Sequence, residues 1–470
     1  MGSHWSPQDP SQPTLAELLS DESPLLGLAQ SFRDEGHELY LVGGPVRDAL
    51  LRREPGDLDL STDATPAQIK DLIAEVATEV WLHGERFGTV GARIAGTAVE
   101  ITTFRTERYQ PASRHPDVSF TADVRTDLSR RDFTVNAMAL RLPERESLDP
   151  FDGVGDLKRK LLRTPIAPHD SFTDDPLRML RAFRFASQLE FDIAPEVLAA
   201  ITELKQELIT VSGERIRDEL SRLVTGSKPA AALKLADTTG ITDLFLPELS
   251  ALKLEQDPVQ KHKDVFIHTL AVLERTKPKL ELRLAALLHD IGKPKTRRIT
   301  EEKVSFHHHE VVGAKMAEHR LRALRFPNEI VATVRDLIAL HHRFHTYRLG
   351  WTDSAVRRYV KDAGPLLETL NDLVRADCTT RNPNKVKELS ARMVELEGRI
   401  AELAQREELS RIRPELDGRE VMEYLGLLPG PQVGEALAFL LEVRLDEGEI
   451  GRDEVLKRLD EWARAKGITS

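Results

Sequence analysis

The sequence predicts an α+β fold, with a mixed sheet in the N-terminal third and helices in the rest of the chain. Three observations support this prediction. Apolar runs of strand length recur in the first third, at residues 38–41, 57–61, 89–95, 98–104 and 134–142. From Asp175 onward, apolar residues recur every three or four positions, which is the period of an amphipathic helix. The length of 470 residues exceeds what one hydrophobic core supports, so we expect several domains.

The first elements build a turn that suits phosphate. We expect a helix over 15–36, a strand over 38–41 and then the paired glycines Gly43–Gly44, after which a helix carries Arg47. Glycines let a ligand approach the backbone closely, and the N–H groups of such a turn can bind phosphate. The turn is therefore a candidate phosphate site.

Two carboxylates stand two residues apart in the second apolar run, at Asp57 and Asp59. Because side chains alternate along a strand, both are expected to point to the same face. An aligned pair of this kind is what two Mg²⁺ ions need to clamp a nucleoside triphosphate. Glu100, inside the strand expected over 98–104, is a candidate third ligand, direct or through water. Taken alone, the Asp-x-Asp pattern also fits a solvated strand edge at which the carboxylates cap a turn.

A run of arginines opens the helical part of the chain. The acidic pair Asp174–Asp175 precedes Pro176, and proline suits the first turn of a helix with carboxylates at its N-terminal end. The helix carries an arginine at every third position, which makes one cationic stripe of Arg178, Arg181 and Arg184. A solvated face explains three arginines about as well as a binding site does. It does not explain the acidic pair in front of them.

Residue types that bind metals gather in the C-terminal half. His289 and Asp290 are adjacent at the end of an apolar run. Further histidines and one aspartate lie before and after this pair, at His268, His307–His309, His341–His342 and Asp377. Imidazole nitrogens combined with carboxylates suit a divalent transition metal or Mg²⁺. A single histidine is usually an ordinary core or surface residue, but the set as a whole predicts a metal site.

Composition limits the classes of function. The formal net charge of −11 is unlike that of a general nucleic-acid binder, although an acidic protein can bind RNA through local basic patches. Candidate patches are Lys158–Arg159–Lys160 and Arg357–Arg358 with Lys361, and a solvated face explains either one about equally well. The single cysteine, Cys378, excludes an intramolecular disulfide framework, and no apolar run is long enough to cross a bilayer. We therefore expect a cytoplasmic protein.

Four longer motifs carry a family resemblance. They are L-V-G-G-x-V-R-D…D-L-D-L-S-T-D-A-T-P from Leu41, R-R-D-F-T-V-N-A-M from Arg130, D-P-F-D-G-V-G-D-L from Asp149 and D-D-P-L-R-M-L-R-A-F-R-F-A from Asp174. A looser fifth match runs from Glu214 to Leu220. In this order they resemble bacterial class II CCA-adding tRNA nucleotidyltransferases, in the poly(A)-polymerase-like branch of the polymerase β superfamily. One departure is Asp174–Asp175, where that family often has Glu–Asp.

The resemblance implies how the chain is divided. It implies a disordered tail over 1–14, a polymerase β-like nucleotidyltransferase head over 15–155, an all-helical neck with base recognition over 156–250, an HD domain over 251–384 and a helical tail over 385–470 that is a candidate for tRNA binding. The implied activity is template-independent addition of CCA to the 3′ end of tRNA from CTP and ATP, by two-metal transfer with release of pyrophosphate. The implied partners are therefore tRNA, CTP and ATP, and the sequence indicates no protein partner.

The resemblance also assigns roles to residues of the head and neck. Asp57 and Asp59 would hold Mg²⁺, and Gly44 and Arg47 would hold the triphosphate. Arg131 would contact the incoming nucleotide near its ribose or phosphates, with support from Asn136. Asp175 and Arg178 would read the Watson–Crick edge of the base, because aspartate accepts from an exocyclic amine and arginine donates to ring or carbonyl acceptors. Arg181 and Arg184 would complete the nucleotide pocket.

The adjacent His289–Asp290 resembles the signature of the HD phosphohydrolase superfamily. The resemblance implies a first ligand set of His268, His289, Asp290 and Asp377, a second metal or phosphate set of His309 and His341, and a phosphate contact from Lys293. The divalent metal at this site and its catalytic competence stay open.

Two alternatives to CCA addition remain at this stage. The same head chemistry fits a poly(A) polymerase or an enzyme that adds only A or only CC. The resemblance implies that the loop between Phe104 and Phe120 helps to switch the pocket from CTP to ATP and that enzymes adding only CC tend to have it shortened, so its full length here favours complete CCA addition. A reading of a different class is an HD metal-dependent phosphohydrolase or phosphodiesterase whose head is a degenerate RNA-binding module. The intact Asp57 and Asp59 argue against that reading.

Overall fold

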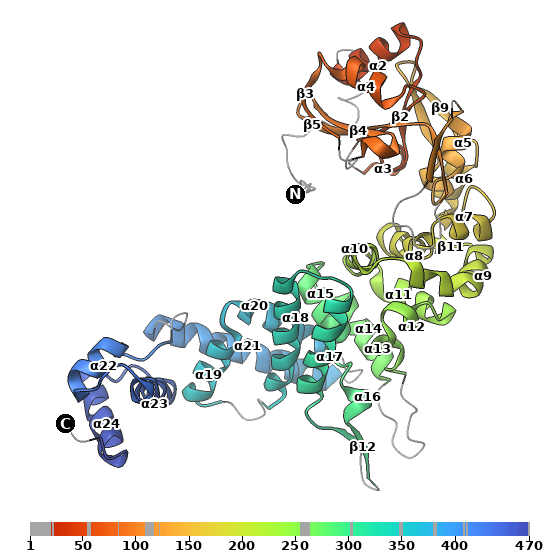
Figure 1. Cartoon of the computed structure of the whole chain (residues 1–470). Coiled ribbons are helices and arrows are strands. Elements are labelled where there is room, and N and C mark those ends of the chain that lie inside the picture. The colour runs from red at the N-terminus through yellow and green to blue at the C-terminus, as the bar shows by residue number, and fades with distance from the viewer. Residues whose placement is uncertain are drawn as a thin grey trace. The chain divides into compact units, whose positions relative to one another are not determined.

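The computed structural model describes residues 20, 23–53, 58–82, 84–108, 117–121, 123–253, 264–300, 304–346, 351–378, 383–407, 409 and 412–468. The chain divides into two compact units, Met1–Pro247 and Glu248–Ser470 (Figure 1). The large sheet lies in the first unit, and the second unit is almost entirely helical. The predicted α+β fold class is therefore confirmed.

The first unit is built on one seven-stranded mixed sheet, with strand order β3-β4-β5-β2-β1-β8-β9. Its strands are β1 (Leu39–Val42), β2 (Leu58–Thr62), β3 (Ala77–Trp81), β4 (Thr89–Ile94), β5 (Thr97–Thr103), β8 (Ala139–Leu142) and β9 (Glu146–Leu148). The β2–β5 pair is parallel, and every other pair in this sheet is antiparallel. Strands β6 (Arg105–Arg108) and β7 (Asp117–Phe120) form a separate hairpin, whose connecting residues 109–116 lie outside the described part.

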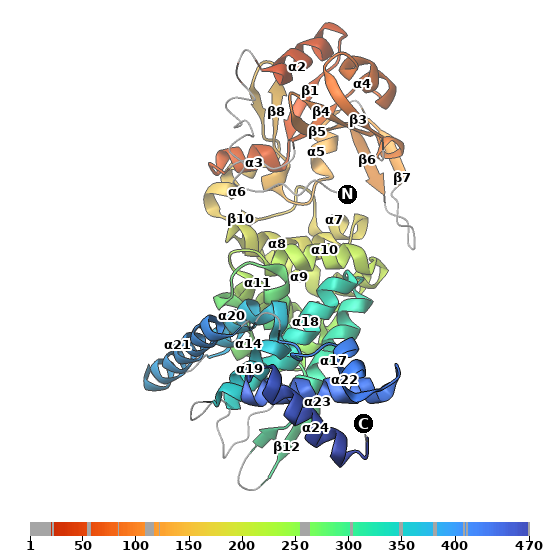
Figure 2. The ribbon, with the colours of Figure 1, turned by 90° about the vertical axis from the view of Figure 1, so that its left-hand side faces the viewer.

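One face of the sheet carries the core of the head. Helices α2 (Pro24–Asp34) and α4 (Pro66–Ile73) cover it, as Figures 1 and 2 both show. Leu58 and Leu60 of β2 are buried in the same apolar cluster as Phe32 of α2 and Ile69 of α4. Because side chains alternate along a strand, Asp59 faces the other side of the sheet. Helix α3 (Gly44–Leu50) contacts β1 and β2.

The segment expected as a strand over 134–142 is only partly a strand. Residues Thr134–Asn136 form a short 3₁₀ turn, η2, and the strand begins at Ala139. The N–H groups of Asn136 and Ala137 bond to carbonyls three residues back, at Phe133 and Thr134. The side chains of Thr134 and Asn136 bond to Asp156 and Asp132, which holds the turn closed. The expectation of a strand from residue 134 was therefore wrong.

The rest of the described part of the first unit is helical apart from one small strand pairing. Its helices are α5 (Val124–Ser129), α6 (Gly153–Arg159), α7 (Pro168–Asp174), α8 (Arg178–Leu189), α9 (Pro195–Leu204), α10 (Gly213–Val224), α11 (Pro229–Thr239) and α12 (Thr242–Phe245). Short 3₁₀ segments are η1 (Glu85–Phe87) and η3 (Lys205–Thr210), and β10 (Leu161–Leu162) pairs with β11 (Asp192–Ile193). Helix α8 packs against α10 and α11, so its buried face supports the arginines considered below.

The second unit is a set of helices with one hairpin. Its elements are α14 (Val265–Arg275), α15 (Leu280–Leu288), α16 (Lys293–Thr296), β12 (Arg297–Ile299), β13 (Val304–Phe306), α17 (His309–Ala323), α18 (Asn328–Leu340), η4 (His341–Thr346), α19 (Asp353–Ala363), η5 (Gly364–Leu366), α20 (Leu367–Asp377), α21 (Pro383–Arg406), α22 (Gly418–Leu425), α23 (Pro431–Glu447) and α24 (Arg452–Ala465); α13 (Pro247–Ser250) spans the boundary. The sequence periodicity did not reveal the β12–β13 hairpin. Among the helices described, none combines the length and the apolar character needed to span a membrane.

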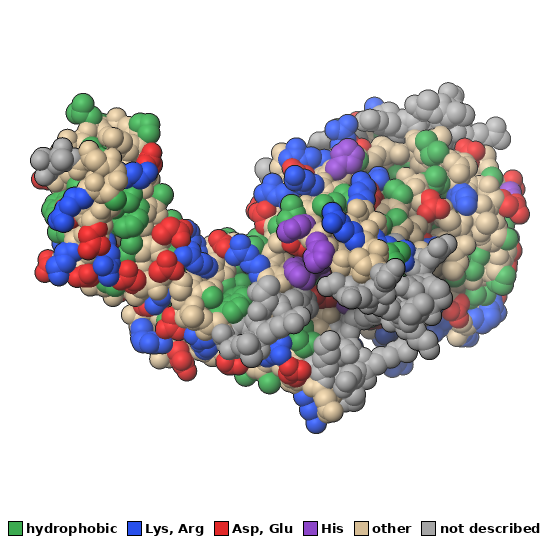
Figure 3. Space-filling view, turned by 90° about the horizontal axis from the view of Figure 1, so that it is seen from below, with side chains coloured by type: hydrophobic (Ala, Val, Ile, Leu, Met, Phe, Trp, Pro, Cys, Tyr) green, Lys and Arg blue, Asp and Glu red, His purple; other side chains and the backbone are tan. Residues whose placement is uncertain are grey.

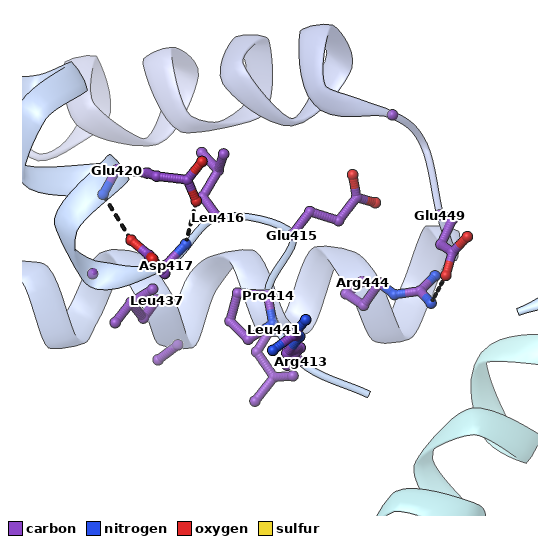
Figure 4. Close-up of a pocket in the computed structure, with 13 residues that line it drawn as sticks. Arg413, Pro414, Glu415, Leu416, Asp417, Glu420, Leu437, Leu441, Arg444 and Glu449 are labelled. Carbon is purple, nitrogen blue, oxygen red and sulfur yellow. Dashed lines mark hydrogen bonds and ion pairs between the residues drawn. The ribbon is translucent and has the colours of Figure 1, made fainter. Parts of the chain in front are cut away.

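The C-terminal helices have their own core and a pocket. Leu416, Val421, Leu440 and Leu459 belong to the apolar cluster that joins α22, α23 and α24. The loop before α22 and one side of α23 line a pocket of about 870 Å³, in which the capping contacts between Asp417 and Glu420 are visible (Figure 4). Its lining residues include no residue that the sequence assigned to a site.

A buried ion network joins α19 to the end of α21 and to α23. Both oxygens of Glu407 accept bonds from Arg357, at 2.8 and 3.0 Å, and one of them also accepts from Arg444 at 3.2 Å. Arg357 and Arg444 are each about 5 % exposed. The hypothesis of a basic RNA-binding patch at Arg357–Arg358 was therefore wrong for Arg357, and Arg358 is paired with Glu442 and Asp446.

Replacing Glu407 with alanine is expected to lower the free energy of unfolding by about 3 kcal/mol, because two buried guanidinium groups lose their carboxylate. Urea-induced unfolding followed by circular dichroism measures the change. Glu442→Ala is the matched control, since it removes the same charge from an exposed pair with Arg358 and is expected to cost less than about 1 kcal/mol. Equal destabilisation by the two variants would show that the network contributes nothing beyond a surface ion pair.

Candidate functional site

The glycine pair forms a turn in which only the first position requires glycine. Gly43 has a φ of +75°, and a Cβ there would lie 2.6 Å from Nη1 of Arg131. A Cβ on Gly44 would come no closer than 3.8 Å to Nη2 of Arg47. The sequence predicted both glycines in a phosphate-binding turn, with Gly44 as the site residue, whereas the structure shows that Gly43 is the position that needs glycine.

Arg47 is held in one orientation by its neighbours. Its Nε and Nη2 donate to the two oxygens of Asp48, at 2.9 and 2.8 Å, and its Nη1 donates to Oδ1 of Asn136 at 2.7 Å. Asn136 in turn donates from Nδ2 to Oδ1 of Asp132 at 2.9 Å. The structure therefore joins Arg47 of the first motif to Asn136 of the second and, through Asn136, to Asp132.

The acidic residues of the head lie on adjacent parallel strands. Asp59 of β2 is the register partner of Glu100 of β5, so the two carboxylates share the face of the sheet opposite the α2–α4 core. Asp59 is half-buried and Glu100 is exposed. Asp57 lies outside the described residues, so its alignment with Asp59 stays a prediction. A donor set of carboxylate oxygens on one face fits Mg²⁺, which prefers oxygen ligands.

Arg131 connects this acidic face to the glycine turn. Its Nη1 approaches Gly43, as the close Cβ distance above shows, and its Nη2 lies 3.5 Å from Oγ of Ser61 in β2 and 3.8 Å from Asp127. Ser61 and Asp59 are two residues apart on the same strand, so both side chains point to the same face. The structure thus gathers the glycine turn, Arg131 and the carboxylates on one side of the sheet.

The arginine stripe of α8 is not a solvated helix face. Arg178 and Arg184 are buried, and Arg181 is about one-third exposed. Arg178 donates to the carbonyl and hydroxyl oxygens of Ser171 and to the carbonyl of Arg130. Asp175 accepts from the N–H of Leu177 at 3.1 Å. Because two of the three arginines are buried, the solvated-face interpretation is ruled out. Burying an arginine is costly unless it is paired or hydrogen-bonded, which accounts for these contacts.

Each remaining cation of this helix has an acidic partner. Arg181 lies 2.8 Å from Asp132, and Arg184 lies 2.9 Å from Glu219. Burial, together with the charge of Arg181, lowers the pKa of Arg184 to about 10. Burial acts to raise the pKa of Asp132, but the charge of Arg181 and the hydrogen bond from Asn136 outweigh it, so the net shift is downward.

Arg215 is a residue of this site that sequence reasoning gave no role. It lies in the looser fifth motif, in α10, and its Nη2 is 2.8 Å from Oδ2 of Asp175. The only sequence signal was that fifth match. The contact shows that the fifth motif supports the acidic residue of the fourth.

The predicted metal ligands of the second unit come together in two groups. His268, His289 and Asp377 offer ligand atoms within 4.8 Å of one another, and so do Asp290, His309 and His341. Asp290 lies between the groups: its Oδ2 is 3.3 Å from Nε2 of His289, and its Oδ1 is 3.6 Å from Nε2 of His309. Five of the six residues are buried, and the side chain of Asp377 is about 11 % exposed. The structure thus brings the six predicted residues to one place, although it groups Asp290 with His309 and His341 and not with His268, His289 and Asp377; their role as ligands stays a prediction.

The donor atoms of this centre are arranged as metal ligands are. Nδ1 of His289, His309 and His341 lies 2.8, 2.9 and 2.6 Å from a backbone carbonyl, which places the proton on Nδ1 and directs the Nε2 lone pair inward. Lone pairs and carboxylates that face one another repel unless a cation lies between them. The residues therefore fit a divalent cation in each group.

The electrostatics of the centre agree with that fit. Burial lowers the pKa of His289, but the charges and hydrogen bonds of Asp290 and Asp377 outweigh it and raise that pKa to about 10. Burial and the nearby His289 lower the pKa of His341 to about 3. Lys293 lies 2.7 Å from Asp290 and supplies another positive charge. The carboxylates of Asp290 and Asp377 thus favour a positive charge at His289, and a divalent cation bound at its Nε2 would take the place of the proton.

Histidines also mark the surface beside this centre. On the face seen in Figure 3, histidine side chains gather next to Lys and Arg side chains. His307, His308 and His342 are exposed. The ring centroid of His342 is 5.1 Å from that of His309, so His342 lies at the edge of the centre. The sequence reasoning noted His342 without assigning it to the ligand set, and the adjacent His341 was the available signal.

Three family models match the chain in succession. Residues 39–163 match the Poly A polymerase head domain, residues 190–253 match the probable RNA and SrmB-binding site of polymerase A, and residues 265–407 match the HD domain. The first match covers the glycine turn, Asp59, Glu100 and Arg131, and the third covers the histidine-rich centre, whereas Asp175 and the arginines of α8 lie between the first two matches.

Among curated proteins, an A-adding tRNA nucleotidyltransferase of Deinococcus radiodurans is 34 % identical over 438 residues, which cover 90 % of this chain and 95 % of that protein. A CCA-adding enzyme of Pediococcus pentosaceus is 40 % identical over 234 residues, which cover 50 % of this chain and 58 % of that protein. The stronger local identity to the CCA-adding enzyme is thus confined to about half of the chain.

Solved structures give the same picture of the fold. The CCA-adding enzyme of Bacillus stearothermophilus in complex with CTP has a TM-score of 0.71 and 26 % identity, and the match covers 94 % of this chain and 98 % of that one. The Thermotoga maritima CCA-adding enzyme complexed with tRNA shares the fold, with a TM-score of 0.59 and 18 % identity over 96 % of this chain and 98 % of that one.

Proposed function

Because the chain belongs to the tRNA nucleotidyltransferases that have a poly(A) polymerase-type head, we propose that it adds CCA to the 3′ end of tRNA from CTP and ATP. The observation that carries the proposal is the placement of Asp59 and Glu100 on the side of the sheet that also holds Ser61 and Arg131. Carboxylates beside cations are what metal-assisted transfer from a nucleoside triphosphate needs. The related enzymes that bind CTP and tRNA support the choice of substrates.

The chemistry needs no side-chain nucleophile. The 3′-oxygen of the tRNA attacks the α-phosphorus of the nucleotide, a new P–O bond forms, and the bond to pyrophosphate breaks. Mg²⁺ ions held by Asp57 and Asp59, with Glu100 as a direct or water-mediated ligand, would lower the pKa of the attacking hydroxyl and stabilise the leaving group. Gly44 and Arg47 bind the triphosphate, and Arg131 contacts the incoming nucleotide.

Base choice is assigned to Asp175 and Arg178. Cytosine and adenine both present an amine donor beside a ring acceptor, which matches a carboxylate next to a guanidinium. Arg215 holds Asp175 at 2.8 Å, and Arg178 is fixed by Ser171 and the Arg130 carbonyl, so both groups start in defined orientations. A base would exchange for some of these contacts.

The deciding experiment uses three tRNA transcripts, which lack CCA, end in C or end in CC. With CTP and ATP, the first is expected to grow by three nucleotides, and with CTP alone by two. Product length on a sequencing gel measures the outcome. Extension of only the transcript ending in CC, by one A, would instead identify an A-adding enzyme. That activity is the second candidate, because the chain is 34 % identical to an A-adding enzyme over 95 % of that enzyme's length. A long A tail would identify a poly(A) polymerase.

A second activity is proposed for the HD centre. The two ligand groups joined by Asp290 support hydrolysis of a phosphate ester by a pair of divalent cations, which would supply an activated water and stabilise the leaving oxygen. The substrates expected from the superfamily are phosphomonoesters or cyclic phosphodiesters of nucleotides or RNA ends.

A tRNA substrate and the single cysteine support a cytoplasmic location.

A further inference from the structure

One aromatic ring stands at the centre of the arginines in the head and neck. Phe185 of α8 has three guanidinium carbons near its ring centroid, those of Arg184 at 4.0 Å, Arg47 at 5.3 Å and Arg181 at 5.9 Å. All three distances fall within the range in which the ring quadrupole attracts a cation. Arg47 comes from α3 and the other two arginines from α8, so the ring joins two elements that are distant in the sequence, since α3 ends at Leu50 and α8 begins at Arg178.

The ring itself is held in place. Phe185 is about 5 % exposed, and it packs edge-on against the fully buried ring of Phe133, with centroids 5.7 Å apart and an interplanar angle of 85°. Phe133 belongs to the motif that also contains Asp132 and Asn136. The ring of Phe185 is therefore held rigidly, and its position is coupled to the residues that bond Arg47.

The three cations do not repel one another freely, because each has its own carboxylate. Arg47 pairs with Asp48 at 2.8 Å, Arg181 with Asp132 at 2.8 Å and Arg184 with Glu219 at 2.9 Å. Three like charges around one ring would otherwise separate, and the attraction to the ring would not keep them together. The cluster is close to neutral before a ligand arrives.

The ring of Phe185 adds a further contact to Arg47, which Asp48 and Asn136 already hold. Asp48 and Asn136 hold the edges of its guanidinium, and Phe185 lies beside the group at 5.3 Å. A guanidinium has five N–H donors, of which these contacts use three. Among the residues described, none accepts a hydrogen bond from the other two donors, which belong to Nη1 and Nη2. Each terminal nitrogen therefore keeps one N–H group that can donate to a phosphate oxygen.

We propose that Phe185 is a positioning residue for the triphosphate: its ring fixes Arg47, together with Arg181, in the orientation that receives the phosphates of either CTP or ATP. This inference rests on the proposed function, because it takes Arg47 as a triphosphate-binding residue. The ring acts through the arginines and touches no reacting atom. Its loss should therefore weaken the binding of both nucleotides equally and leave base choice unchanged.

The test compares Phe185→Leu with Phe185→Tyr, using the full chain. Phe185→Leu is expected to raise KM for CTP and for ATP about tenfold and to change kcat less than about twofold. Phe185→Tyr keeps the ring and is expected to restore KM to within about twofold of the wild-type value. The dissociation constant for inorganic tripolyphosphate, measured by calorimetry, is expected to rise by the same factor as KM in the leucine variant.

Phe183→Leu is the matched control. Phe183 is fully buried in the same helix, and no ring or cation contact is recorded for it among the described residues. It loses the same aromatic volume and is expected to lower stability without changing KM. A tenfold rise in KM in Phe183→Leu as well would assign the effect to helix packing and overturn the proposal.

A substitution that keeps the shape of the ring covers the case in which Phe185→Leu does not fold. Fluorinated phenylalanines placed at position 185 weaken the quadrupole stepwise with little change in volume, so KM is expected to rise with each added fluorine. A KM that is independent of fluorination would overturn the proposal. If the wild-type chain incorporates neither nucleotide, the proposed function fails; if it does and KM stays constant in every Phe185 variant, only the inference fails.

Discussion

Replacing Asp59 with asparagine is expected to lower the rate of nucleotide incorporation by about 10³-fold or more. Asparagine keeps the volume of the side chain on β2 but removes the charge that a divalent cation needs. The neighbouring Leu58 and Leu60 remain buried against the α2–α4 core, so the sheet should still form. Single-turnover incorporation of labelled ATP or CTP into tRNA measures the rate.

The control for Asp59→Asn is Glu79→Gln, which makes the same change of charge on the edge strand β3. Glu79 is about 63 % exposed and forms a surface ion pair with Arg93 at 3.1 Å, so incorporation should stay within about twofold of the wild-type rate. A wild-type rate in Asp59→Asn would remove the head from the catalysis. The phosphohydrolase interpretation of the chain would then be preferred.

Replacing Asp290 with asparagine is expected to remove both divalent cations from the HD centre and to abolish any hydrolysis of phosphate esters. The reason is geometric: its two oxygens reach toward His289 at 3.3 Å and His309 at 3.6 Å, so one carboxylate serves both ligand groups. Metal content per chain, measured by mass spectrometry, should fall from two ions to none. Nucleotide incorporation should not change, since the head has its own acidic residues.

Two comparison variants make the Asp290 result specific. His341→Ala removes a ligand from only one group, so one ion is expected to remain. Asp336→Asn makes the same chemical change at a half-exposed residue that pairs with Arg335, and both ions are expected to remain. Retention of two ions and of hydrolysis in Asp290→Asn would show that Asp290 is not shared between two metals.

The sequence predicted the chemistry of both sites better than their geometry. The six candidate HD ligands could be chosen in advance because the adjacent His289–Asp290 resembles the HD signature, and the structure places all six side chains together. Phe185 could not be chosen, because an apolar residue in a helix is expected to be core and nothing local marks it as a partner of three arginines. Arg357 was misjudged for a related reason: adjacent arginines look solvated until Glu407 and Arg444, from distant helices, are seen to bury one of them.

Secondary structure shows the same division. Alternation and helical periodicity correctly predicted the mixed sheet and the helical second half. They failed at Thr134–Asn136, where Asp132 and Asp156 draw the side chains into a turn, and at the β12–β13 hairpin, which is too short to show a period. The domain boundaries expected at 155, 250 and 384 stay predictions.

By itself, the sequence determined which residue types this protein devotes to phosphates and metals, and in which order along the chain, because those choices depend on charge and ligand chemistry that each residue carries with it. Tertiary structure alone decided which cations are buried, which carboxylate neutralises each one and which aromatic ring they share. Those properties depend on distances between segments as far apart as α3 and α8, and such distances exist only after the chain has folded.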